Sequence, residues 1–337
     1  MMKILITSPF HEHGLKQLKE HFEVIYENWR ESGKIYFDED ELIEKIKTEK
    51  FDIIITEADE IDKDVIEKTN LKLIASTRGT PVNIDDEVAA KKGIPVIYTP
   101  HRNADAVADL TVAMMLTQAR KIIEIDRYLR SGNYNTAELE DEEDFAEFYN
   151  RFQGTELGSL TIGIIGFGAI GQRVAKRLQN GFGSKILFFD PYISEDHTSV
   201  IETSSKKVDL EHLMRNSDMV TIHTAPVEET EELVDAKMLA LMKPTAHFFN
   251  LARSFCINED ALYEAIEQKR IAGAGLDVFD DEPCDSENRF LKFNNVTVTP
   301  HFGGNTHDVI KHQTDMIVLD ILNFLEDKPL KNLWKGN

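Results

Sequence analysis

Three polar residues in the second half of the chain could together catalyse a reaction at a carbonyl group. Arg253, Glu282 and His301 each follow the end of a predicted strand, and ligand sites in open α/β sheets lie beyond the carboxyl ends of the strands. Arginine binds carboxylates and polarises carbonyl oxygens, and a histidine beside a carboxylate transfers protons near neutral pH. The spacing alone leaves an alternative open, in which all three are ordinary surface or turn residues.

A glycine-rich turn at residues 166–171, with the sequence GFGAIG, predicts a dinucleotide-binding site. It follows an apolar run and opens a helical pattern, and a second apolar run ends on Asp190, 19 residues after Gly171. The glycines permit a tight turn, close approach of a pyrophosphate and packing of helix on strand, while the helix N-terminus attracts phosphate. Asp190 stands where a ribose-binding acid belongs. Its carboxylate would repel a 2′-phosphate, which favours NAD over NADP.

Two sets of alternating strands and helices must position these residues. Before the turn, strands are expected at 3–7, 24–26, 52–56, 71–76 and 95–98, and helices at 15–21, 40–48, 63–68 and 85–92. A long helix is expected over 103–129. After the turn, strands are expected at 186–189, 219–223, 247–251, 275–278 and 296–299, and helices at 209–215, 236–242 and 259–268. Such alternation of apolar strands with helices predicts two doubly wound parallel sheets.

The last helical pattern, residues 307–325, has no sheet of its own to join. We therefore expect it to pack on the first domain, so that the nucleotide domain is an insertion. The predicted boundaries are 1–101 and 302–337 for a substrate-binding domain and 102–301 for an NAD-binding domain.

Composition and charge narrow the class of protein. The 337 residues are 42% hydrophobic and 29% charged, with a net charge of −22 that argues against a nucleic-acid partner. Two cysteines supply neither a disulfide framework nor a metal site, and no apolar run reaches the roughly 18 residues needed to cross a membrane. The acidic tract 138–144 is interpreted as an exposed insertion, because consecutive carboxylates diverge and no histidine accompanies them. A cytoplasmic protein without a metal is expected.

Several segments, in order along nearly the whole chain, resemble the D-isomer-specific 2-hydroxyacid dehydrogenase family. The most specific are NLARS at residues 250–254, LDVF at 276–279 with Glu282-Pro283, and TPHFGG at 299–304. The segments 83–85 and 93–96 add matches in the first domain. The resemblance implies a Rossmann NAD-binding domain inserted into a flavodoxin-like substrate domain, and a homodimer.

The resemblance also assigns roles to individual residues. It implies that Arg253 orients the substrate, that His301 is the acid/base, and that Glu282 hydrogen-bonds His301. The glycines of the turn, Gly166, Gly168 and Gly171, are expected to bind the cofactor. The further cofactor positions that the resemblance implies are Ala169, Ile170, Asp190, Leu251, Ala252, Asp277 and Gly304. The expected function is NAD-dependent interconversion of a D-2-hydroxyacid and its 2-oxoacid.

The predicted substrate loop departs from the family pattern. Arg78 and Thr80 stand on either side of Gly79 where the family often has glycines, and Arg102 lies at the other edge of the expected cleft. Two arginines in so acidic a chain suggest a small anionic substrate with a further charged group, such as 3-phosphoglycerate. The alternative, equally open, is that both arginines pair with acids across the domain hinge. The chain ends soon after its last helix, so the C-terminal regulatory domain of many phosphoglycerate dehydrogenases is not expected.

Two other functions are compatible with this fold. One is an NAD(H)-sensing protein similar to the family's corepressors, which the retained Arg253, Glu282 and His301 argue against. The other is a dehydrogenase with a sugar-derived substrate, such as an erythronate phosphate.

Overall fold

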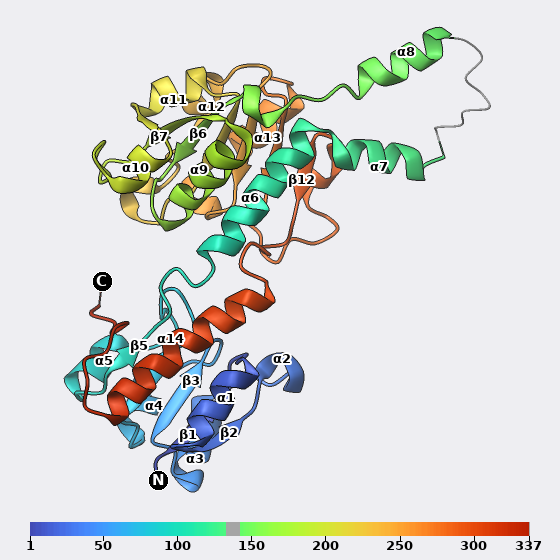
Figure 1. Cartoon of the computed structure of the whole chain (residues 1–337). Coiled ribbons are helices and arrows are strands. Elements are labelled where there is room, and N and C mark those ends of the chain that lie inside the picture. Colours follow the sequence, from blue (N-terminus) through green and yellow to red (C-terminus); the bar gives the residue numbers. More distant parts are fainter. Residues whose placement is uncertain (133–141, 337) are drawn as a thin grey trace. The chain divides into compact units, whose positions relative to one another are not determined.

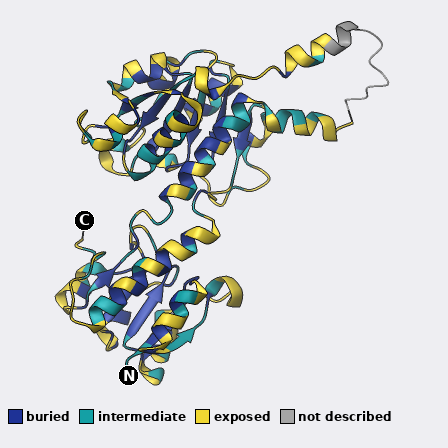
Figure 2. Cartoon of the chain, viewed as in Figure 1, coloured by how far each residue is buried: buried dark blue, intermediate teal, exposed yellow. Residues whose placement is uncertain are grey.

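The chain forms two compact α/β units, each built around a parallel sheet. The computed structural model describes residues 1–132 and 142–336, so part of the predicted acidic insertion at 138–144 lies outside the described residues. The first unit comprises Met1–Asn103 and Asn305–Asn337, and the second comprises Ala104–Gly304. In both units, helices flank a sheet whose strands are largely buried (Figures 1 and 2). The predicted fold class, two doubly wound parallel-sheet domains, is confirmed.

The first sheet has the strand order β2-β1-β3-β4-β5, with all strands parallel. Its strands are β1 (Lys3–Ile6), β2 (Glu23–Tyr26), β3 (Ile53–Thr56), β4 (Leu73–Ser76) and β5 (Val96–Ile97). The helices of this unit are α1 (Glu12–Lys19), α2 (Trp29–Ser32), α3 (Glu39–Glu49), α4 (Lys63–Lys68), α5 (Asp86–Lys91) and α14 (His307–Leu325). From β1 the chain passes to β2 on one side and then to β3 on the other, so the topological switch point lies between β1 and β3.

Alternate residues of the central strands face two separate cores, as the period of a strand requires. Leu5, Ile54 and Ile74 pack with α3, α4 and α5, whereas Ile4 and Ile53 pack with α1 and α14. The last helix therefore completes the first unit, which confirms the expectation that it packs there (Figure 1).

The second sheet has the order β12-β11-β10-β9-β6-β7-β8, again parallel throughout. Its strands are β6 (Thr161–Ile165), β7 (Lys185–Phe189), β8 (Lys206–Lys207), β9 (Met219–Ile222), β10 (His247–Asn250), β11 (Gly273–Leu276) and β12 (Val296–Val298). The α-helices are α6 (Ala104–Ala119), α7 (Ile122–Arg130), α8 (Glu142–Arg151), α9 (Ala169–Phe182), α10 (Thr198–Glu202), α11 (Leu210–Asn216), α12 (Ala236–Ala240) and α13 (Glu259–Glu267). Helices α6 and α9 cover one face, and α11, α12 and α13 cover the other.

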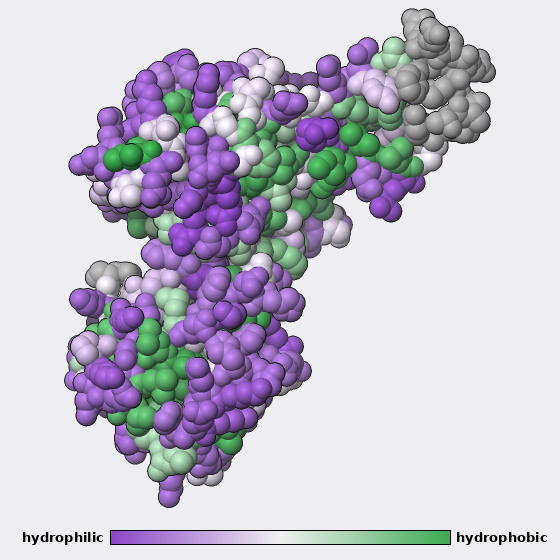
Figure 3. Space-filling model, viewed as in Figure 1, coloured by the Kyte–Doolittle hydropathy of each residue, from purple (hydrophilic) through white to green (hydrophobic). Residues whose placement is uncertain are grey.

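The single helix expected over 103–129 is wrong, because the structure divides it into α6 and α7. Lys121 adopts a left-handed conformation with φ of 52° between the two helices, and its ammonium donates a hydrogen bond to the carbonyl oxygen of Arg151 at 2.7 Å. Helix α7 has no buried residue, and hydrophobic residues gather on its surface in Figure 3. The short β8 and α2 were not predicted either.

Two features that bear on function are absent from the described residues. None of their helices is both long enough and apolar enough to cross a membrane. The same residues contain no group of three or more histidine, cysteine, aspartate or glutamate side chains placed to hold a metal ion.

Candidate active site

The glycine turn lies at the switch point of the second sheet, between the end of β6 and the start of α9. Gly166 has a φ of +86°, and a Cβ there would lie 2.8 Å from the carbonyl carbon and oxygen of His223. At Gly171 a Cβ would lie 2.2 Å from the carbonyl oxygen of Gly166. At Gly168 it would meet no atom within 4 Å. Two of the glycines are thus required by close packing, and the third leaves the outer side of the turn open.

The N-terminus of α9 is suited to an anion. Gly168 is the N-cap and supplies no side-chain cap, and the first turn, which begins with Ala169 and Ile170, contains no acidic residue. Its N–H groups and the positive end of the helix dipole are therefore available to phosphate oxygens.

Asp190 follows β7 and ties its end to the glycine turn. One carboxylate oxygen accepts a hydrogen bond from the N–H of Phe167 at 2.8 Å, and the other accepts from Tyr192 and Ile193 at 2.8 and 3.1 Å. The residue is only 9% exposed. A carboxylate has about four acceptor positions, so these three bonds fix its orientation and leave capacity for a ribose hydroxyl.

Two residues beside this turn, His223 and Thr224, were not predicted as site residues from the sequence. The Nδ1 atom of buried His223 and the Oγ1 atom of Thr224 are buried without a hydrogen-bond partner among the described residues. Burial lowers the pKa of His223 to about 3, so the ring is neutral. Buried polar atoms without partners are rare, and a bound cofactor would offer partners to both. The open turn, the uncapped helix and these atoms fit a dinucleotide.

His301 and Glu282 form the one predicted catalytic pair that the structure brings into contact. Nδ1 of His301 lies 2.8 Å from a carboxylate oxygen of Glu282, whose other oxygen accepts from the N–H of Phe279 at 3.2 Å. The side chains are 43% and 35% exposed. Because a carboxylate only accepts, Nδ1 carries the hydrogen, and Nε2 has no partner in the described part of the chain.

Buried Asp277 holds the loop that carries His301. Its carboxylate accepts hydrogen bonds from the hydroxyl of Thr299 and from the N–H groups of Phe302 and Gly303, at 2.7 and 2.8 Å for the two N–H groups. Its carbonyl oxygen accepts from the N–H of His301 at 2.7 Å. His301 itself has a φ of 60°, a left-handed conformation uncommon for a residue other than glycine. Asp277 thus orients the imidazole through the backbone.

Arg253 is positioned by Asn250, to which no site role was assigned from the sequence. The buried side chain of Asn250 accepts from the N–H of Ala252 and donates to the carbonyl oxygen of Arg253, both at 3.0 Å. These bonds shape the loop after β10, including Leu251. The guanidinium of Arg253 is exposed and donates to the carbonyl oxygen of Ala252 at 2.6 Å.

The strand register places Arg253 and His301 at one edge of the sheet. Asn250 pairs with Leu276 and Leu276 with Val298, so Asn250 and Val298 lie in one row across the sheet with β11 between their strands. Arg253 and His301 each stand three residues past that row. Among the described residues, no hydrogen bond or ion pair joins Arg253 to His301 or Glu282.

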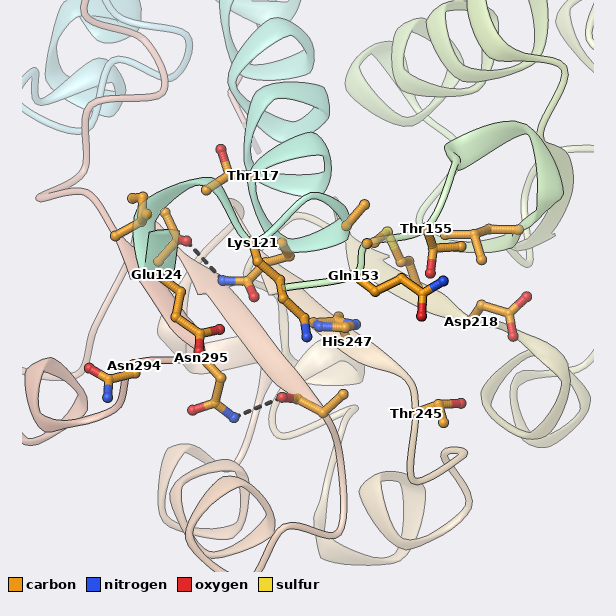
Figure 4. A pocket seen from close by; sticks show the side chains of 18 residues that line it. Thr117, Lys121, Glu124, Gln153, Thr155, Asp218, Thr245, His247, Asn294 and Asn295 are labelled. Atoms are coloured by element: carbon orange, nitrogen blue, oxygen red, sulfur yellow. Dashed lines mark hydrogen bonds between the residues drawn. The ribbon is translucent and has the colours of Figure 1, made fainter. Parts of the chain in front are cut away.

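A cavity of about 460 Å³ lies at the opposite edge of this sheet (Figure 4). Its lining includes Lys121, Asp218, His247 and Asn295, which lie beside α7 or at the starts of strands. None of the predicted site residues lines it. Burial, with the charge of Lys121 as a smaller cause, lowers the pKa of His247 to about 4. This cavity is therefore separate from the Arg253 and His301 loops.

The four predicted substrate-binding residues all lie in the first unit. Arg78 is half-buried after β4, and Gly79 and Thr80 are exposed. Arg102 forms an ion pair with Glu57 at 2.9 Å and donates to the side-chain oxygen of Gln313. Arg102 thus pairs with an acid of its own unit, whereas no ion pair of Arg78 occurs within the described residues.

The second unit matches a known family directly. The family model for the D-isomer specific 2-hydroxyacid dehydrogenase, NAD binding domain, matches residues 112–303. A putative 2-hydroxyacid dehydrogenase, YoaD of Bacillus subtilis, is 38% identical over 99% of this chain and 91% of its own length. A glyoxylate reductase of Thermococcus litoralis is 34% identical over 98% of this chain and 96% of its own length.

A solved structure shares the architecture of the whole chain. The TT0316 protein from Thermus thermophilus is 29% identical and has a TM-score of 0.81, with 98% of this chain and 99% of that chain covered. The family match, the relatives and the geometry of the glycine turn agree. The chain therefore belongs to the D-isomer specific 2-hydroxyacid dehydrogenase family, and it is an NAD-dependent D-2-hydroxyacid dehydrogenase.

Proposed function

We propose that His301 is the acid/base of this dehydrogenase, that Glu282 fixes its tautomer, and that Arg253 binds the carboxylate of the 2-oxoacid. The observation that carries the proposal is the 2.8 Å contact between Nδ1 of His301 and Glu282. Because Nδ1 is engaged by Glu282, Nε2 of His301 is the nitrogen that exchanges a proton with the substrate oxygen. The Glu282 carboxylate stabilises the charged imidazolium from which that proton is given during reduction.

The cofactor is assigned to the second unit. The turn of Gly166, Gly168 and Gly171, with the N–H groups of Ala169 and Ile170, would hold the pyrophosphate, and Asp190 would bind the adenosine ribose. The nicotinamide end would lie near Leu251, Ala252, Asp277 and Gly304. When bound, the reduced nicotinamide supplies the hydride for the keto carbon, and the protein contributes placement and electrostatics.

The protein's own residues complete the reduction of the 2-oxoacid. Arg253 holds the substrate carboxylate in a charge-assisted contact, and its positive charge polarises the neighbouring keto group. His301 then gives its Nε2 proton to the oxygen as the carbonyl becomes a hydroxyl group. Oxidation of the hydroxyacid reverses each step, with neutral His301 accepting the proton.

For the substrate, we propose a 2-oxoacid with a second anionic group, with the 3-phosphoglycerate pair as one candidate. Arg78, Gly79 and Thr80 belong to the proposed substrate-binding domain, residues 1–101 and 302–337. Residues 102–301 form the proposed NAD-binding domain, and Arg102 stands at its boundary. The support is the half-buried guanidinium of Arg78, which no carboxylate neutralises among the described residues.

The test compares the variant His301→Gln with a control variant, His212→Gln. The control removes an exposed histidine on α11 of the same unit. NADH oxidation is measured with glyoxylate and hydroxypyruvate, and NADH affinity is measured by fluorescence titration. His301→Gln should lose at least about 100-fold in kcat, the usual size of acid–base catalysis, with NADH affinity within threefold. Near-normal turnover by His301→Gln would refute the assignment. Tight NADH binding by a wild-type protein that reduces no 2-oxoacid would favour an NAD(H) sensor.

We also propose a homodimer in which α7 packs against a second copy. Ile122 and Leu129 of this helix are 51% and 49% exposed, and exposed apolar patches mark association surfaces. The mass of Leu129→Glu, measured by light scattering, should fall to that of a monomer. The control is Ile201→Glu, which alters another exposed aliphatic residue of the second unit (66% exposed) and should remain dimeric. A monomeric wild type, or a dimeric Leu129→Glu, would contradict the proposal.

A further inference from the structure

The cavity at the edge of the second sheet where the strands begin has no part in the proposed reaction (Figure 4). None of the residues assigned to the reaction or the cofactor lines it, and neither do Ile122 and Leu129 of the proposed dimer surface. All of its lining residues belong to the second unit. Its volume of about 460 Å³ falls within the range of roughly 300–1,000 Å³ that is usual for small-molecule sites. The cavity therefore offers room for a separate ligand.

Hydrogen bonds and close packing fix the walls of this cavity. The segment that contains Gly154 crosses the C-terminal end of α6, where the N–H of Thr155 donates to the carbonyl oxygen of Ala119 at 2.9 Å. A Cβ at Gly154 would lie 2.6 Å from the same oxygen, so the crossing leaves no room for a side chain there. On the side of the sheet, the side chain of Asn295 donates to the carbonyl oxygen of Ala272 at 2.7 Å (Figure 4). The cavity is thus bounded by segments that are bonded to one another.

Two charged side chains line the cavity without an ion pair. Lys121, between α6 and α7, donates a hydrogen bond to the carbonyl oxygen of Arg151 and forms no ion pair among the described residues. Glu124, three residues later, forms neither a hydrogen bond nor an ion pair with any described residue. The third charged group of the lining, Asp218, is already neutralised by Lys243 at 2.7 Å. One ammonium group and one carboxylate therefore remain for a ligand.

The imidazole of His247 is a neutral polar group beside this ammonium group. Figure 4 shows the end of the Lys121 side chain next to the ring. Burial, with the charge of Lys121 as a smaller cause, lowers the pKa of His247 to about 4, so the ring is neutral. Neither ring nitrogen has a hydrogen-bond partner in the described part of the chain, so the ring can donate one hydrogen bond to a ligand. A carboxylate of the ligand would accept from both His247 and Lys121.

The cavity also has an apolar wall, formed by Ile123, Leu160 and Met219. Small-molecule sites typically combine such apolar surface with a few polar groups that fix the orientation of the ligand. The apolar wall favours a ligand that carries an apolar part next to its charged groups.

We infer that this cavity binds a zwitterionic small molecule, an amino acid with an apolar side chain. Its carboxylate is bound by Lys121 and His247, its ammonium group by Glu124, and its side chain by the apolar wall. A simple anion would leave Glu124 unpaired, and a simple cation would leave Lys121 unpaired, whereas a zwitterion pairs with both. The inference does not depend on the proposed catalytic residues.

The experiment measures binding to the full chain by isothermal titration calorimetry in the presence of saturating NADH. The probes are L-leucine, L-methionine and L-phenylalanine, of which at least one should bind. The tightest probe is then compared with the carboxylic acid that lacks only its ammonium group and with the amine that lacks only its carboxylate. For leucine these are 4-methylpentanoate and 3-methylbutylamine. Each analogue should bind at least about tenfold more weakly, because it loses a charge-assisted contact.

Variants locate the bound amino acid. Lys121→Met and Glu124→Gln should each weaken its binding by about tenfold or more. Lys176→Met, which removes an exposed lysine of α9, should bind it as wild type does. Arg253→Gln should also bind it as wild type does, because the cavity is separate from the candidate active site. Unchanged NADH affinity in a fluorescence titration confirms that each variant is folded, and Glu124→Gln serves alone if Lys121→Met does not fold.

Three results would overturn the inference. The first is that none of the three amino acids binds, and the second is that either analogue binds as tightly as its parent. The third is that Glu124→Gln binds the amino acid as wild type does, or that Arg253→Gln loses it, which would place the ligand in the candidate active site. None of these results bears on the role of His301, which the reduction of 2-oxoacids tests separately.

Discussion

Neutral, buried His223 should make the second unit less stable in mild acid. Burial lowers the pKa of this side chain from 6.5 to about 3, whereas the unfolded chain should titrate near 6.5. Because the folded pKa is the lower one, the contribution of His223 to stability is complete above about pH 6.5 and is lost as the pH falls. Between pH 7 and pH 5 the unfolded state gains most of a proton and the folded state gains almost none. The expected loss is about 2 kcal/mol of unfolding free energy.

The assay is urea unfolding of wild type and His223→Gln at pH 7 and pH 5, followed by far-UV circular dichroism. Other titrating groups contribute equally to both proteins, so the variant should lose about 2 kcal/mol less than wild type over this interval. Both tryptophans, Trp29 and Trp334, lie in the first unit, so their fluorescence reports that unit and should show no such difference. An equal acid-induced loss in the two proteins would refute the argument.

Three further predictions concern the second unit. Wild type should prefer NADH to NADPH by at least about 100-fold in kcat/KM, because the carboxylate of Asp190 repels a 2′-phosphate. Asp190→Ser removes that carboxylate and should reduce the preference. Gly166→Ala should weaken NADH binding more than tenfold in a fluorescence titration, since its φ of +86° and the nearby carbonyl of His223 exclude a Cβ. Asn250→Ala should cost about 1–3 kcal/mol in urea unfolding and lower kcat, because it leaves the N–H of Ala252 unpaired.

Features set by local sequence were predictable. The alternation of apolar strands with helices indicated both sheets. The glycine spacing located the turn before α9, and polar residues after strands pointed to Glu282 and His301. Their contact at 2.8 Å was expected from family resemblance. The spacing alone left it open, since the two residues follow different strands.

Features set by distant contacts were not predictable. Arg102 meets Glu57, 45 residues earlier in the chain, and neither residue's neighbours indicate the pairing. The break at Lys121 is marked by no glycine or proline, so a helical pattern continues through it. Asn250 and His223 look like ordinary strand residues in the sequence. Only the fold shows that Asn250 shapes the Arg253 loop and that His223 is buried against the glycine turn.

The most direct test of the central claim is NADH-dependent reduction of 2-oxoacids with analysis of the product by chiral chromatography. Glyoxylate, hydroxypyruvate, pyruvate, oxaloacetate and phosphohydroxypyruvate should be supplied to wild type and to His301→Gln. Wild type should consume one NADH for each hydroxyacid formed, and every chiral product should be the D-isomer. His301→Gln should form product at least about 100-fold more slowly. An L-product, or product formed as fast by His301→Gln as by wild type, would contradict the account.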